Sequence, residues 1–91
     1  MQLNIDAILQ RINANIYEFK VEKGSRVCDK KIMEIKFPED TILALVFRNG
    51  EVLTPYGNLT LLENDIVATL ATEETQPVLI PYFKNLSFLF G

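Results

Sequence analysis

The sequence predicts a single small α+β domain built from short strands and short helices. Residues 16–21 alternate apolar and polar side chains, which is typical of a half-buried strand. Asn49-Gly50 lies between two runs of strand-forming residues, where it favours a tight hairpin. Pro38 and Pro77 mark the end of one expected helix and the start of another. With 91 residues, 48% of them apolar and 23% charged, the chain is an ordinary globular sequence too short for two cores.

The N-terminal segment carries an apolar repeat at helical spacing. Ile5, Ile8 and Ile12 recur every three or four residues, which predicts a short amphipathic helix over 5–13. The alternative is that residues 1–15 are a connector from a neighbouring domain. Both interpretations place the start of the compact domain near residue 16.

A second helix is expected after the strand over 16–21. Gly24-Ser25 breaks the strand, and Ser25 is a candidate N-cap. The apolar residues that follow share one helical stripe: Val27, Cys28, Ile32 and Ile35. This helix is expected to end before Pro38, with the single cysteine as a core residue. A basic cluster, mixed with acidic residues, is expected to form its solvated face with local pairing: Lys23, Arg26, Lys30, Lys31 and Lys36.

The segment 41–55 gives the clearest local prediction. Both central residues of a type I′ turn need positive φ, which Asn49-Gly50 tolerates. A two-residue loop then pairs Arg48 with Glu51, Val46 with Leu53, and Ala44 with Pro55. One face is expected to hold Ile42, Ala44, Val46 and Leu53 beside the Arg48–Glu51 pair. The other is expected to hold Leu43, Leu45, Phe47 and Val52.

Both faces of the first hairpin strand are therefore apolar. A strand buried on both sides needs a layer on each side. Two short helices cover one face well and the second only poorly. A neighbouring chain is the candidate for the second cover.

The C-terminal third predicts one more strand and one more helix. Residues 63–65 form a turn, and 66–71 read as a strand. Pro77 precedes a helix over 78–83, whose regularity Pro81 limits. The tail, 85–91, is apolar enough to dock.

Composition excludes several functions. The chain has no His, which removes His-based triads and His-ligated metals, and one Cys, which removes an intramolecular disulfide. A net charge of −3 and a pI of about 4.8 argue against nucleic-acid binding. The apolar run 42–47 is too short to span a bilayer, and the N-terminus does not look like a secretory signal. Glu63 and Asp65 are candidate ligands for a divalent cation, with a solvated turn as the alternative. No carboxylate pair suggests an enzyme.

The elements in order resemble the TrkA-C domain, the C-terminal half of the RCK (regulator of potassium conductance) module. The resemblance covers about residues 16–83 and rests on these motifs: Ser25-x-Val27-x-x-Lys30-x-Ile32-x-Glu34-Ile35-x-Phe37-Pro38, the run 42–47, Arg48-Asn-Gly-Glu51, Pro55-x-Gly57 and Leu61-Leu62-Glu63-x-Asp65. Two positions depart from the family, which usually has Gly at Asp29 and at Asn64. Asparagine is the next-best residue after glycine in a left-handed turn, so a turn at Asn64 is still expected. Asp29 is expected to be a change on a helix surface. The domain is expected to span 16–84.

The resemblance implies a small mixed, mainly antiparallel four-stranded sheet with flanking short helices, paired as a homodimer. It further implies a regulatory, ligand-sensing domain on the cytoplasmic side of a potassium or other monovalent-cation transport system, without enzyme activity. The partner would be a transporter or channel subunit, or a Rossmann-type domain of the same protein. The alternative is a purely structural dimerisation module without a small ligand.

In several bacterial members the ligand resembles cyclic di-AMP, held at the dimer two-fold axis. The positions that the resemblance assigns to such a site are Ile42, Leu43, Ala44, Arg48, Thr54 and Pro55. The apolar residues would contact adenine, and Arg48 would offer donors to a phosphate. The alternatives are an Arg48–Glu51 pair across the hairpin, and a core or interface role for the apolar residues.

Overall fold

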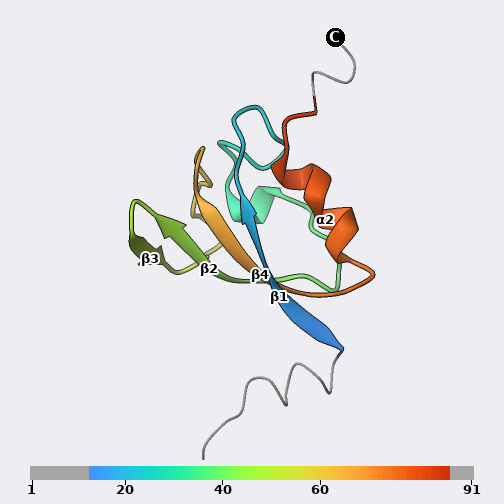
Figure 1. Ribbon diagram of the computed structural model, residues 1–91. Helices are drawn as coiled ribbons and strands as arrows, with labels where there is room; N and C mark the ends of the chain where they lie inside the picture. Colours follow the sequence, from blue (N-terminus) through green and yellow to red (C-terminus); the bar gives the residue numbers. More distant parts are fainter. Residues whose placement is uncertain (1–12, 87–91) are drawn as a thin grey trace, which may run out of the picture.

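The computed structural model describes residues 13–86, and these form an antiparallel sheet with one helical layer (Figure 1). The strands are β1 (Ala14–Lys20), β2 (Ile42–Arg48), β3 (Glu51–Leu53) and β4 (Ile66–Thr72), in the order β1-β4-β2-β3. Every strand pairing in the described part of the chain is antiparallel. The predicted α+β class and four-stranded sheet are confirmed. The helix predicted over 5–13, apart from Asn13, and the end of the tail, 87–91, lie outside the described residues.

The central hairpin forms as its turn sequence predicts. Asn49 has φ 51° and Gly50 φ 79°, the positive pair that a type I′ turn requires. Arg48 pairs with Glu51 and Val46 with Leu53, as expected. β3 ends at Leu53, so the pair predicted between Ala44 and Pro55 is not part of the ladder.

A β-bulge in β2 corrects the predicted division of its two faces. Against β4, Leu43 pairs with Thr69 and Leu45 with Ala68, which leaves Ala44 as the extra residue. A bulge shifts the alternation by one residue. Leu43 therefore joins Val46 on the core side, while Ile42 lies on the opposite side with Leu45. The sequence prediction was wrong for Ile42 and Leu43, which exchange faces.

The α-helix predicted between Ser25 and Pro38 is also wrong. The segment is a series of turns that ends in a single 3-10 turn, η1 (Ile32–Glu34). Asp29 has φ 64°, in the left-handed region that an α-helix excludes. Glycine adopts this conformation without strain, and the positive φ places Asp29 in a turn rather than on the helix surface that was predicted. Ser25 is buried and caps no helix.

Backbone hydrogen bonds to the segment 57–61 replace helical bonds here. The N–H groups of Asp29 and Ile32 donate to the carbonyls of Leu61 and Leu59, and Leu61 N–H donates to Lys30 O. These bonds dock the turns against a second loop, so the apolar side chains still reach the core. Cys28 is buried as expected, and desolvation raises the pKa of its thiol.

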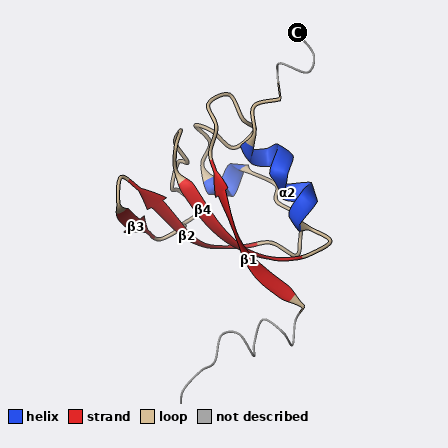
Figure 2. Ribbon diagram, viewed as in Figure 1, coloured by secondary structure: helices blue, strands red, loops and turns tan. Residues whose placement is uncertain are grey.

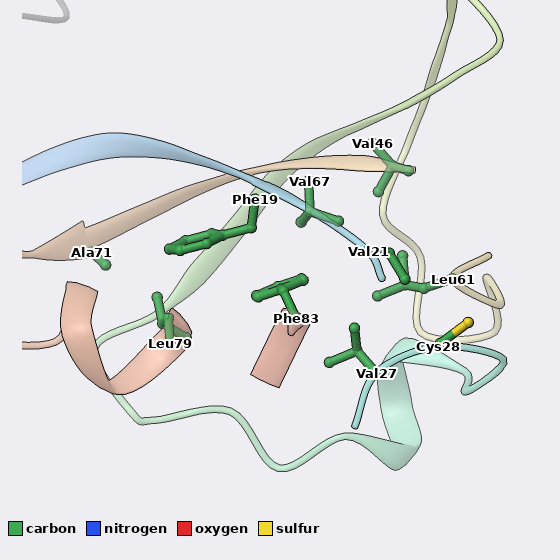
Figure 3. Packing of buried hydrophobic residues seen from close by; sticks show 10 residues of the cluster. All are labelled: Phe19, Val21, Val27, Cys28, Val46, Leu61, Val67, Ala71, Leu79 and Phe83. Atoms are coloured by element: carbon green, nitrogen blue, oxygen red, sulfur yellow. The ribbon is translucent and has the colours of Figure 1, made fainter. Parts of the chain in front are cut away.

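α2 (Gln76–Phe83) confirms the predicted C-terminal helix, with Pro77 in its first turn. α2 and the loop that carries η1 lie together on one side of the sheet (Figure 2). Figure 3 shows the core between these two layers. The cluster consists of Phe19, Val21, Val27, Cys28, Val46, Leu61, Val67, Ala71, Leu79 and Phe83. Phe19 and Phe83 stack with ring centroids 4.8 Å apart.

Candidate functional site

The side of the sheet that faces away from α2 carries an apolar surface. Residues directly opposite in an antiparallel ladder share a face, so the register identifies its members. This surface, called the outer face below, consists of Ile16, Ile42, Leu45, Phe47, Val52, Ile66, Ala68 and Leu70. Four of these side chains are strongly exposed: Ile16 (52%), Ile42 (59%), Leu45 (38%) and Val52 (59%).

The helical layer of residues 13–86 covers only the other side of the sheet (Figure 2). The outer face is thus a bare apolar sheet surface within the described part of the chain. Glu18 and Lys20 on the edge strand β1 share this side, so a charged margin borders it. An apolar centre with a polar rim is the composition of a protein–protein interface.

The C-terminal end of β2 holds a partly buried ion pair. Arg48 donates from Nε to Asp65 Oδ1 at 2.9 Å and from Nη2 to Oδ2 at 2.8 Å. Nη2 also donates to the carbonyl of Thr60 at 2.8 Å. The Asp65 side chain is 1% exposed, and the hydrogen bonds from Arg48 raise the pKa of that guanidinium further above its ordinary value.

The same carboxylate also caps a turn. Leu62 N–H donates to Asp65 Oδ2 at 2.9 Å, and Asn64 adopts φ 73°, as its place in a left-handed turn predicts. Arg48 therefore ties the hairpin to the turn before β4. Glu51, the alternative partner expected from the sequence, lies opposite Arg48 in the ladder, but the ion pairs of the described residues do not include an Arg48–Glu51 pair.

The same contacts compete with a cation at the acidic turn of Glu63 and Asp65. The Asp65 side chain is 1% exposed, and its oxygens accept three hydrogen bonds, two of them from the positively charged Arg48 guanidinium. The described residues contain no group of three or more potential ligands that could hold a metal ion. A hollow of about 130 Å³ lies beside the ion pair, below the size typical of small-molecule pockets.

The structure divides the six residues predicted to bind a ligand. Ile42 is exposed on the outer face, and Ala44 is the half-buried residue of the bulge. Leu43 packs against the core, and Arg48 is held by Asp65. Thr54 and Pro55 follow β3, the first exposed and the second half-buried. Of the six, only Arg48 lines the hollow beside the ion pair, and their binding of a ligand stays a prediction.

Two features of this site were missed from the sequence. The bulge has no local signal, because Ala44 fits a regular strand as well as a bulge. The Arg48–Asp65 pair joins residues 17 apart, and Asp65 read only as part of an acidic turn. The order β1-β4-β2-β3 brings them together, because the end of β2 lies beside the start of β4.

Comparison with known proteins identifies the family. A sequence model of the TrkA-C domain matches residues 16–84, and the chain belongs to this family. Over 71 residues it is 28% identical to the Trk system potassium uptake protein TrkA homolog 1 of Methanosarcina mazei. Over 57 residues it is 32% identical to the Trk system potassium uptake protein TrkA homolog of Archaeoglobus fulgidus.

The matches cover 78% and 63% of this chain but only 16% and 13% of those relatives. Among solved structures, an RCK domain described as being with cda superposes with a TM-score of 0.66 at 20% identity. That match covers 76% of this chain and 97% of the other, and it supports the fold. Within residues 13–86, no helix has both the length and the apolar character needed to cross a membrane.

Proposed function

We propose that this chain is a regulatory domain of a system that transports potassium or another monovalent cation, and that it works as a homodimer. Membership of the TrkA-C family and the potassium uptake relatives support the first part. The partner would be a transporter or channel subunit, or a Rossmann-type domain of the same protein, on the cytoplasmic side of the membrane. The domain would report a ligand or a neighbouring movement to the transport machinery.

The observation that carries the dimer is the outer face. Burying apolar surface stabilises an association by roughly 25 cal/mol per Å². Four strongly exposed apolar side chains on a bare sheet therefore favour burial of this face against a partner. A second copy supplies a matching surface, because an isologous two-fold interface places the same patch on both partners. The charged margin at Glu18 and Lys20 suits the rim of such an interface.

We further propose that the two-fold axis binds cyclic di-AMP. A two-fold axis presents each residue twice, which suits a symmetric ligand. Ile42 and Ala44 belong to the first half of β2, and Thr54 and Pro55 directly follow Leu53, the last residue of β3, which pairs with Val46. Nε and Nη2 of Arg48 are engaged by Asp65 and Thr60, and Nη1 remains to donate to a phosphate. Leu43 would act only by packing beneath the site, since it faces the core.

One observation favours a second candidate, a structural dimerisation module without a small ligand. Arg48 is already satisfied by a bidentate ion pair that joins two loops, so it has a structural role with no ligand present. In this case the outer face alone would transmit movement from the neighbouring domain.

A titration with cyclic di-AMP distinguishes the ligand-binding domain from the structural dimerisation module. We expect saturable binding of cyclic di-AMP by calorimetry with a rise in Tm, because a ligand that binds only the folded state stabilises it. Ile42→Ser is expected to weaken binding by about tenfold or more, through lost apolar contact. Met33→Ser, on an equally exposed side chain of η1, is the matched control. No heat and no shift with cyclic di-AMP would leave the structural module as the function.

A further inference from the structure

A hollow on the helical side of the domain gathers positive charge. It has a volume of about 300 Å³ and lies between the turns after β1 and the end of α2. Its lining consists of Arg26, Lys30, Glu34, Ile35, Lys36 and Tyr82. It therefore belongs to the layer opposite the outer face, and nothing in the proposed dimer or its ligand uses it.

An aromatic column holds one of these cations in place. The Arg26 guanidinium lies 4.2 Å from the centroid of the Tyr82 ring. Tyr82 stacks on Phe37 at 5.5 Å, and Phe37 on Phe83 at 6.3 Å, so the column continues into the core. The Tyr82 hydroxyl donates to Lys36 O at 2.9 Å, which fixes the ring against the hollow. The contact with Tyr82 thus holds the Arg26 guanidinium in the lining of the hollow.

The positive charge of the hollow is not neutralised. The ion pairs of the described residues are Arg48–Asp65 and Glu22–Lys84, so Arg26, Lys30 and Lys36 have no carboxylate within 4.0 Å. Glu34 is the one acidic residue of the lining, and its carboxylate accepts the Lys31 backbone N–H at 3.0 Å. The local pairing expected for this basic cluster is not formed, because the helix that would align the charges is absent.

We propose that this hollow binds the phosphate group of a small phosphorylated molecule. Three cations around one concave site suit a doubly charged oxyanion better than a single carboxylate. The planar guanidinium of Arg26 offers paired donors to phosphate oxygens, and Lys30 and Lys36 add mobile point charges. The volume leaves room for a group attached to the phosphate. The site is independent of the proposed cyclic di-AMP site, and either can fail without the other.

Pyrophosphate and AMP, titrated into the full chain by calorimetry and by 15N-1H NMR at low, constant ionic strength, test the proposal. We expect saturable binding, with chemical shift changes concentrated at the residues of the hollow. Lys30→Gln removes one charge without touching the aromatic column and is expected to weaken binding by about tenfold. Lys23→Gln removes the same charge from an exposed residue outside the hollow and is the matched control.

Arg26→Lys separates geometry from charge, since it keeps the charge and loses the planar fork. We expect it to weaken binding more than Lys23→Gln does. Equal weakening in Lys30→Gln and Lys23→Gln would overturn the proposal, because it would show a diffuse charge effect. Absence of saturable binding, or retention on phosphatidylglycerol vesicles without binding of free phosphates, would also overturn it.

Discussion

Arg48 and Asp65 form the polar contact on which the local architecture most depends. The carboxylate is buried and receives three hydrogen bonds, two from Arg48 and one from Leu62 N–H. Because the pair links the end of the hairpin to the turn before β4, it fixes two loops that are 17 residues apart in sequence. The Arg48 guanidinium is only partly exposed, so solvent screens the attraction between the two charges incompletely.

Asp65→Ala tests this contact. The substitution leaves a partly buried guanidinium and a backbone donor without their acceptor, which we expect to cost about 2–4 kcal/mol of unfolding free energy. Urea denaturation followed by circular dichroism measures the change. Lys84→Ala is the control, because it removes the exposed ion pair with Glu22, and its effect is expected to be far smaller. Equal effects of both variants would contradict the structural role of Asp65.

Glu22 provides a pH-dependent contribution to stability. The backbone N–H of Asn85, and then Lys84, lower the pKa of this carboxyl below its ordinary value of 4.5. A lowered pKa stabilises the fold above the ordinary value, and that contribution is lost as the pH falls through the folded-state pKa. We expect Glu22→Gln to reduce the loss of stability between about pH 5 and pH 3. Glu73→Gln, at an exposed residue of the loop between β4 and α2, is the control; a pH profile unchanged by Glu22→Gln would contradict the assignment.

At the level of elements, strands and turns with local signals were predictable and the bulge was not. Asn49-Gly50 fixes the hairpin because few residues tolerate consecutive positive φ values. The apolar stripe of 27–35 was read as helical, yet Asp29 adopts a left-handed conformation and the backbone bonds go to the segment 57–61. The spacing of apolar residues along the sequence indicates which side chains are buried. It does not report which partner receives the backbone hydrogen bonds, since that partner lies far along the chain.

The residues of the candidate site were predictable only in part. The surplus apolar face of β2 was visible in the sequence, because both sides of the run 42–47 are apolar. Which residues form that face was not, because the bulge at Ala44 exchanges Ile42 and Leu43. The partner of Arg48 likewise required the strand order, which places β4 beside β2.

Gly50→Ala tests the turn. Gly50 has φ 79° and open space around the position of a Cβ, so strain comes from the backbone alone. We expect a cost of about 1–2 kcal/mol in unfolding free energy. Gly57→Ala is the matched control, since Gly57 has no positive φ and its Cβ would lie 3.4 Å from Met33 Cβ. A Gly50→Ala variant as stable as Gly57→Ala would contradict the type I′ geometry.

The whole molecule is a two-layer structure with one side of its sheet covered and the other bare. α2 and the turns after β1 enclose the core on one side (Figure 3). On the other side of the sheet, apolar side chains from all four strands form the outer face. A regulatory domain that pairs through this face would leave the basic hollow on the helical layer accessible in both copies.

The molar mass of the chain in solution, measured by size-exclusion chromatography with light scattering, tests the dimer most directly. We expect the wild type at twice 10.4 kDa, and Ile42→Glu and Val52→Glu at 10.4 kDa with unchanged circular dichroism. Met33→Glu places the same charge on an exposed apolar residue of the other layer and is expected to stay dimeric. A wild-type monomer at every concentration, or a dimer that both outer-face variants retain, would contradict pairing through the outer face.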